Sequence, residues 1–105
     1  MVFIFNIMRV QKMTHDEIIN KYQSLFTDEK GDQRLTYLEI PEEWYFLVDT
    51  LCTQILEYLK VNPDACPFYV VQVKEKFGGL RFYAEGGDKY IEGLIAMSEA
   101  YSYYL

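Results

Sequence analysis

Three cationic side chains and a tyrosine lie close to the Gly78–Gly79 pair, and they are the residues with the clearest chemistry. Lys74 and Lys76 precede the glycines, and Arg81 and Tyr83 follow them. If the glycines form a two-residue hairpin turn, the alternation of side chains along a strand places all four on one side of a two-stranded ribbon. Ammonium and guanidinium groups beside an aromatic ring suit an anion, either an acidic protein side chain or a phosphate. Lys74, Lys76, Arg81 and Tyr83 are therefore candidate binding residues.

The opposite side of this ribbon is apolar. In the register that a Gly78–Gly79 turn imposes, Phe77 faces Leu80 and Lys76 faces Arg81. The apolar side then carries six residues: Val71, Val73, Phe77, Leu80, Phe82 and Ala84. The two facing cations repel each other. The pattern therefore predicts either a carboxylate of this chain or an anionic partner beside them.

A catalytic or metal-binding set of residues is not apparent in the sequence. Glu75 falls on the apolar side of the ribbon, but no acid, base or metal ligand is placed beside it, which favours a structural role. His15 is the only histidine, and Cys52 and Cys66 are the only cysteines. The close cluster of about four ligands that a zinc site needs is therefore missing. We predict that the protein is not an enzyme, that it uses no metal or cofactor, and that both cysteines are reduced.

The composition is that of one folded domain. The chain has 105 residues, half of them apolar and 17% aromatic, which is incompatible with a disordered polymer. Its net charge of −6 disfavours general affinity for nucleic acids or membrane surfaces. Residues 1–12 are apolar but too short to span a bilayer, so a cytoplasmic location is expected. Ten tyrosines are unusual, and tyrosine is enriched at contact surfaces.

Helical patterns lie before and after the ribbon. Thr14 to Glu17 reads as a capping box, which predicts a first helix over residues 16–26 with His15 on its exposed first turn. The longest helix is predicted from Pro41 to about Lys60, and its apolar stripe consists of Trp44, Leu47, Val48, Leu51, Ile55, Tyr58 and Leu59. The last helix begins after Asp88 and runs to near the chain end, where Tyr101 and Tyr104 flank its apolar stripe.

These elements predict an α+β fold in which an antiparallel β-hairpin packs against two to three helices. A further strand, either within residues 1–12 or in the extended segment before Pro41, would enlarge the hairpin into a small sheet. Residues 1–12 are otherwise expected to be an upstream extension. The whole chain, residues 1–105, is predicted to form a single domain.

The segment Val73-Lys-Glu-Lys-Phe-Gly-Gly-Leu-Arg-Phe-Tyr83, preceded by Glu43-Trp-Tyr45 and Leu51-Cys52, resembles a family of small phage and prophage proteins of unassigned function. The resemblance runs from about Pro41 to Tyr101 and implies a viral protein in the cytoplasm of a bacterial host. Many members of that family continue into a Cys-x-x-Cys pair that looks like half of a metal site. This chain stops where that pair would begin, so no metal-linked role is expected.

Two functional hypotheses follow. The first is a protein–protein interaction module that binds and blocks a host protein of defence or nucleic-acid handling. In this reading, acidic side chains of the first two helices mimic phosphate, and Tyr101 and Tyr104 are apolar anchors. The alternative is a nucleic-acid-binding module that uses Lys74, Arg81 and their neighbours on the basic side of the hairpin. Self-association through exposed tyrosines and a free sheet edge is a further expectation.

Overall fold

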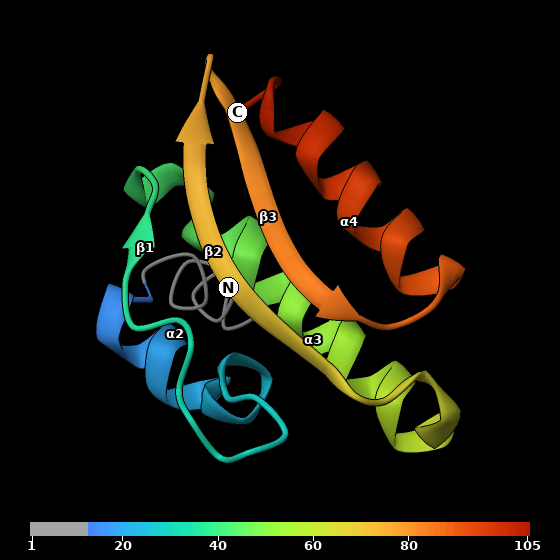
Figure 1. Ribbon diagram of the computed structural model, residues 1–105. Helices are drawn as coiled ribbons and strands as arrows, with labels where there is room; N and C mark the ends of the chain where they lie inside the picture. The colour runs from blue at the N-terminus through green and yellow to red at the C-terminus, as the bar shows by residue number, and fades with distance from the viewer. Residues whose placement is uncertain (1–12) are drawn as a thin grey trace, which may run out of the picture.

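The structure, a computed structural model, describes residues 13–105. The elements in chain order are α2 (His15–Lys21), η1 (Gln23–Phe26), β1 (Leu38–Glu39), η2 (Glu42–Trp44), α3 (Tyr45–Val61), η3 (Pro63–Ala65), β2 (Phe68–Lys76), β3 (Gly79–Gly86) and α4 (Lys89–Ser102). In Figure 1, α3 passes behind the sheet and α4 lies beside β3. The predicted α+β class is confirmed. The extension or strand predicted within residues 1–12 lies outside the described residues.

The sheet has three strands in the order β1-β2-β3. The central strand β2 pairs antiparallel with β3 and parallel with β1, where Leu38 lies opposite Val73. The segment before Pro41 therefore does supply a strand, and the sheet is mixed rather than a hairpin alone. Parallel pairing follows from the long connection between β1 and β2, which contains the whole of α3.

The hairpin turns one residue earlier than predicted. Phe77 and Gly78 occupy the turn, with φ of 56° and 82°, and Lys76 lies opposite Gly79. The Glu75 carboxylate accepts a hydrogen bond from the Gly78 N–H at 2.7 Å, which closes this turn. The predicted pair of Lys76 and Arg81 is therefore wrong, as is the placement of Phe77 on the apolar side, because its ring is 85% exposed at the tip.

The two sides of the hairpin nevertheless keep their chemical character. Arg81 lies opposite Lys74, which displaces the ladder by two residues from the predicted register. A shift of two residues preserves side-chain alternation, whereas a shift of one would have exchanged the two sides. A β-bulge between Val70 and Gln72 then changes the alternation, so Val70 is fully buried while Val71, predicted to face the core, is only half-buried.

The core lies between the apolar side of the sheet and the helices. Three parts of the chain contribute most of its buried residues. The first helical segment contributes Ile18, Tyr22, Leu25 and Phe26, and α3 contributes Val48, Leu51, Cys52 and Ile55. The hairpin contributes Val70, Val73, Leu80 and Phe82.

Two predicted helix starts are confirmed, because the Thr14 capping box and the Asp88 cap are both formed. The predicted start of the longest helix at Pro41 is wrong, because Glu42–Trp44 form the 3-10 turn η2 and α3 begins at Tyr45. The first helix differs from prediction, because its α-helical part ends at Lys21 and continues as a 3-10 turn.

His15 is not on an exposed turn, as the sequence suggested. Its side chain is 18% exposed, and its Nε2 accepts a hydrogen bond from the Leu38 N–H at 2.8 Å. The ring also lies against Tyr37, with 4.5 Å between ring centroids. The imidazole therefore fixes the start of β1 to α2, a structural role that spacing along the chain does not reveal.

Side chains of α4 cover the outer edge of β3. The Leu80 N–H donates to Ser102 Oγ and the Phe82 N–H donates to Glu99 Oε2, each at 2.8 Å. These two N–H groups point away from β2 and would otherwise be an open template for another strand. The free β3 edge expected from the sequence is therefore occupied, and α4 is held in place along the hairpin.

Candidate protein-interaction site

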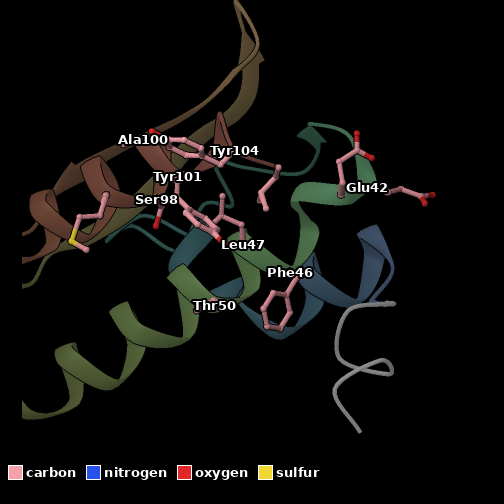
Figure 2. A pocket seen from close by; sticks show the side chains of 11 residues that line it. Glu42, Phe46, Leu47, Thr50, Ser98, Ala100, Tyr101 and Tyr104 are labelled. Carbon is pink, nitrogen blue, oxygen red and sulfur yellow. The ribbon is translucent and has the colours of Figure 1, made fainter. Parts of the chain in front are cut away.

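A groove of about 920 Å³ lies between the first turns of α3 and the last turns of α4. Its lining consists of Glu42, Glu43, Phe46, Leu47, Thr50, Met97, Ser98, Ala100, Tyr101, Tyr104 and Leu105. Figure 2 shows Phe46 and Leu47 projecting from α3, with Tyr101 and Tyr104 on the side of α4 and the chain end. The groove is thus built from two helices that are far apart in the sequence.

Residue spacing on each helix explains which side chains line the groove. Phe46 and Thr50 are four residues apart on α3, and Met97 and Tyr101 are four residues apart on α4, so each pair lies on one helix face. Between the large side chains are small ones, namely Thr50, Ser98 and Ala100. Helices that pack closely fill the space between them with large side chains. Small residues here leave that space open.

The walls of the groove are apolar and accessible. Met97 is 72% exposed, Tyr104 is 84% exposed and Tyr101 is 56% exposed. None of the three makes a side-chain hydrogen bond to another residue in the described part of the chain. Neighbouring apolar side chains that remain in contact with water are a feature of interaction sites, because covering them releases the hydration water.

The charge around the groove is acidic. Glu42 and Glu43 belong to η2 and lie at one end of the lining, and Figure 2 shows the Glu42 carboxylate extending from that end. Within the part of the chain that the structure describes, no lysine, arginine or histidine contributes to the lining. The first turn of a helix tolerates such carboxylates because the helix dipole is positive there. A ligand at this end of the groove therefore meets two carboxylates and no cation.

The four residues predicted on the basic side of the hairpin lie elsewhere and are partly engaged within the chain. Arg81 donates to the Leu80 carbonyl at 3.0 Å and to the Tyr103 hydroxyl at 3.2 Å, and the second of these hydrogen bonds raises the pKa of Arg81. Lys74 Nζ lies 5.8 Å from the centroid of the Tyr83 ring. Lys76 similarly lies over the ring at the tip of the turn.

The carboxylate nearest in register to these cations comes from β1. Glu39 lies beside Lys74 in the parallel pair, and its carboxylate accepts a hydrogen bond from Gln72 at 3.4 Å. Lys74 and Lys76 form no ion pair within 4.0 Å with any residue of 13–105. The sequence predicted a carboxylate of this chain or an anionic partner beside the cations. The carboxylate that lies beside Lys74 in register belongs to Glu39 on the added strand, without an ion pair.

The six predicted site residues therefore separate into two groups. Tyr101 and Tyr104 line the groove, whereas Lys74, Lys76, Arg81 and Tyr83 share the outer side of the hairpin. The sequence pointed to acidic side chains of the first two helices in general but did not single out Glu42, Glu43 or the α3 wall. Phe46 lies between Trp44 and Leu47 of the apolar stripe and widens it, which is the one local signal of a second apolar face. That α4 lies opposite this face depends on tertiary packing.

A polar cluster between α2 and α3 is the main titratable site away from both surfaces. The Tyr22 hydroxyl donates to the Asp49 carboxylate and also contacts Thr53, and Lys21 Nζ lies 3.1 Å from Asp49 Oδ1. Burial and the hydrogen bond to Asp49 raise the pKa of Tyr22 to about 12. Every buried polar side-chain atom in the described part of the chain has a partner. The cluster joins two helices, and none of its residues lines the groove between α3 and α4.

The cysteines do not form a disulfide, and burial raises the pKa of the Cys52 thiol, which suppresses its thiolate. Within residues 13–105 there is no group of three metal-ligating side chains. Over the same range, every helix falls short of the length and apolarity that a membrane crossing requires. Comparison of the chain with protein-family models, curated proteins and solved structures finds no significant match.

Proposed function

We propose that this protein is a small protein–protein interaction module that holds its partner in the groove between α3 and α4. The observation that carries the proposal is the cluster of accessible apolar side chains there, above all Tyr101 and Tyr104. Tyrosine is a frequent anchor at protein interfaces because it buries a large ring at little cost in conformational entropy and keeps a hydroxyl for the rim.

The biological setting we propose is that of a phage-derived inhibitor in the bacterial cytoplasm. It rests on the resemblance of residues 73–83 to small phage proteins, and it assigns the partner to host defence or nucleic-acid handling. An inhibitor of this kind acts by occupying a surface rather than by chemistry. Glu42 and Glu43 would then stand in for phosphate groups against a basic region of the host protein.

Site-specific photo-crosslinking in cells that contain the partner tests the module. A benzoylphenylalanine replaces Tyr104 in one variant and Phe77 in a second, matched variant. These side chains are 84% and 85% exposed, so they differ in location and not in accessibility. We expect a discrete crosslinked protein from position 104 alone, identified by mass spectrometry. Crosslinks confined to position 77, or none from either position, would refute docking at the groove.

A nucleic-acid-binding module is the second candidate, and one observation favours it. Lys74 and Lys76 lack an ion pair within residues 13–105 and lie on the same side of the hairpin as Arg81. Phosphate binding by these cations predicts affinity that falls steeply with salt. A gel-shift series with single- and double-stranded DNA and RNA at low salt tests this. Binding that Lys74→Glu abolishes would support it, and no binding at the lowest salt would exclude it.

A further inference from the structure

We propose that the element that fills the α3–α4 groove is an amphipathic α-helix of the partner protein, with an apolar face toward Tyr101 and a lysine or arginine over Glu42 and Glu43. The inference rests on the proposed function and specifies its partner. Three observations support it: the groove has few hydrogen-bond partners for an extended backbone, its charge is acidic, and the same surface of a second copy of this chain would be acidic too.

The groove has little to offer an extended peptide. Its walls come from two helices, in which only the terminal turns leave backbone groups unpaired, and most of its lining side chains are apolar. An extended segment would bury its N–H and C=O groups there without partners, at a cost of about 1–3 kcal/mol for each group. A helix satisfies its own backbone, so it can lie in an apolar groove.

Addition of a strand to the outer edge of β3 is blocked where α4 covers Leu80 and Phe82. Extended peptides usually bind by adding to a sheet edge, where main-chain hydrogen bonds provide the affinity. On the β3 edge, the N–H groups of Leu80 and Phe82 already donate to side chains of α4. The groove has a volume of about 920 Å³ and lies between two helices, the setting in which helix-in-groove recognition occurs.

The charge of the groove favours a partner with basic side chains. Glu42 and Glu43 are both exposed, and no cation among residues 13–105 lines the groove to compensate them. A cation on the bound helix would pair with these carboxylates and would be attracted by the net charge of −6. A second copy of this chain that presented the same surface would bring two more carboxylates and no cation. Charge complementarity therefore favours a different, basic protein.

The experiment is selection from a displayed library of random peptides of about 18 residues, long enough for five turns of helix. The intact protein is the target, and peptides that also bind Tyr101→Ala are removed by counter-selection. We expect enriched sequences with apolar residues at i, i+3 or i+4, and i+7, together with an excess of lysine and arginine. A synthetic enriched peptide should become helical on binding, as measured by circular dichroism.

Variants locate the binding. For the enriched peptide, measured by fluorescence anisotropy, Tyr101→Ala should weaken affinity by about tenfold or more. Replacing Glu42 and Glu43 with Gln should weaken it by roughly threefold at low salt and less at high salt. Phe77→Ala, at the exposed tip of the hairpin, is the matched control and should leave affinity unchanged. Thermal unfolding of each variant verifies that the fold is intact.

Three results would overturn the inference: enriched peptides without helical periodicity, enriched peptides that are acidic, or no peptide that depends on Tyr101. A concentration-dependent dimer in sedimentation, abolished by Tyr101→Ala, would also overturn it and would make a second copy the occupant. The outcome is separable from that of the proposed function. A crosslinked partner at position 104 with a failed selection leaves the module standing and removes the helix. Selected helical peptides without a cellular crosslink would support a helical ligand for the groove and would remove the proposed cellular partner.

Discussion

On the outer side of the hairpin, the cations already have neighbours: Arg81 donates to Leu80 and Tyr103, and Lys74 lies over the ring of Tyr83. In the α3–α4 groove, Tyr101 and Tyr104 keep large exposed rings without a side-chain hydrogen bond to another described residue. The first surface has more positive charges, and the second has more large apolar side chains that are over half exposed, namely Met97, Tyr101, Tyr104 and Leu105. Since burial of apolar area is the main driving force for association, we favour the groove.

The largest expected effect separates the two surfaces directly. The double variant Tyr101→Ala with Tyr104→Ala should weaken partner binding by about 100-fold, because each ring is a candidate anchor. Its thermal stability should change little, since both rings are more than half exposed. Isothermal titration with the crosslinked partner measures the loss. The double variant Lys74→Ala with Lys76→Ala is the comparison, and an equal loss there would remove the distinction between the surfaces.

Ser102→Ala should loosen α4, which forms one wall of the groove and also covers the outer edge of β3. Ser102 Oγ accepts from the Leu80 N–H and donates to the Glu99 carbonyl at 2.6 Å. Without it the buried Leu80 N–H loses its acceptor, so unfolding by urea should require about 1–3 kcal/mol less. Ser98→Ala, one turn earlier on the same helix, is the control. Equal stabilities for the two variants would contradict the role given to Ser102.

The cluster between α2 and α3 offers a test that should alter stability and leave both surfaces intact. Tyr22→Phe removes the donor to buried Asp49 and should cost about 1–3 kcal/mol. The folded state raises the pKa of Tyr22 to about 12, and the hydrogen bond to Asp49 also raises the pKa of Lys21. Both protons are held more tightly in the folded protein. The stabilisation that these two groups contribute should therefore be complete below about pH 10 and should be lost as the pH rises from there towards 12.

Urea denaturation across this alkaline range measures the dependence. In Tyr22→Phe the decline should be shallower, because the contribution of Tyr22 is removed while those of Lys21 and the buried Cys52 thiol remain. An unchanged slope would show that Tyr22 titrates alike in the folded and unfolded states. Peptide affinity at neutral pH should be the same as that of the parent protein, which separates this site from the groove.

The smallest effect is expected at Gly79, where the hairpin meets the end of the chain. A Cβ there would lie 2.2 Å from the ring of Tyr103, so Gly79→Ala must displace that exposed ring and with it a hydrogen bond to Arg81. Because an exposed contact of this kind contributes little, the stability should drop by less than about 1 kcal/mol. Binding in the groove should be unaffected. A large loss of peptide affinity would show that the two surfaces are coupled.

Gly79 also illustrates where sequence reasoning reached its limit. Two adjacent glycines predicted a turn at both, whereas the turn uses Phe77 and Gly78, and Gly79 is required for the close approach of Tyr103. A glycine signals freedom of the backbone or closeness of a neighbour, and only the folded chain distinguishes these two reasons. The same holds for His15, whose acceptor role depends on a strand that lies 23 residues away in the sequence.

The amino-acid sequence by itself determined the α+β class, the caps at Thr14 and Asp88, and which side of the hairpin is apolar, because these depend on periodicity and on neighbours within a few residues. It also singled out Tyr101 and Tyr104. Only tertiary packing brings these rings, Phe46 and the two carboxylates of η2 into the lining of one groove. The packing of α4 along β3 sets that arrangement, and it is fixed by side-chain hydrogen bonds between residues about twenty positions apart, which no local pattern encodes.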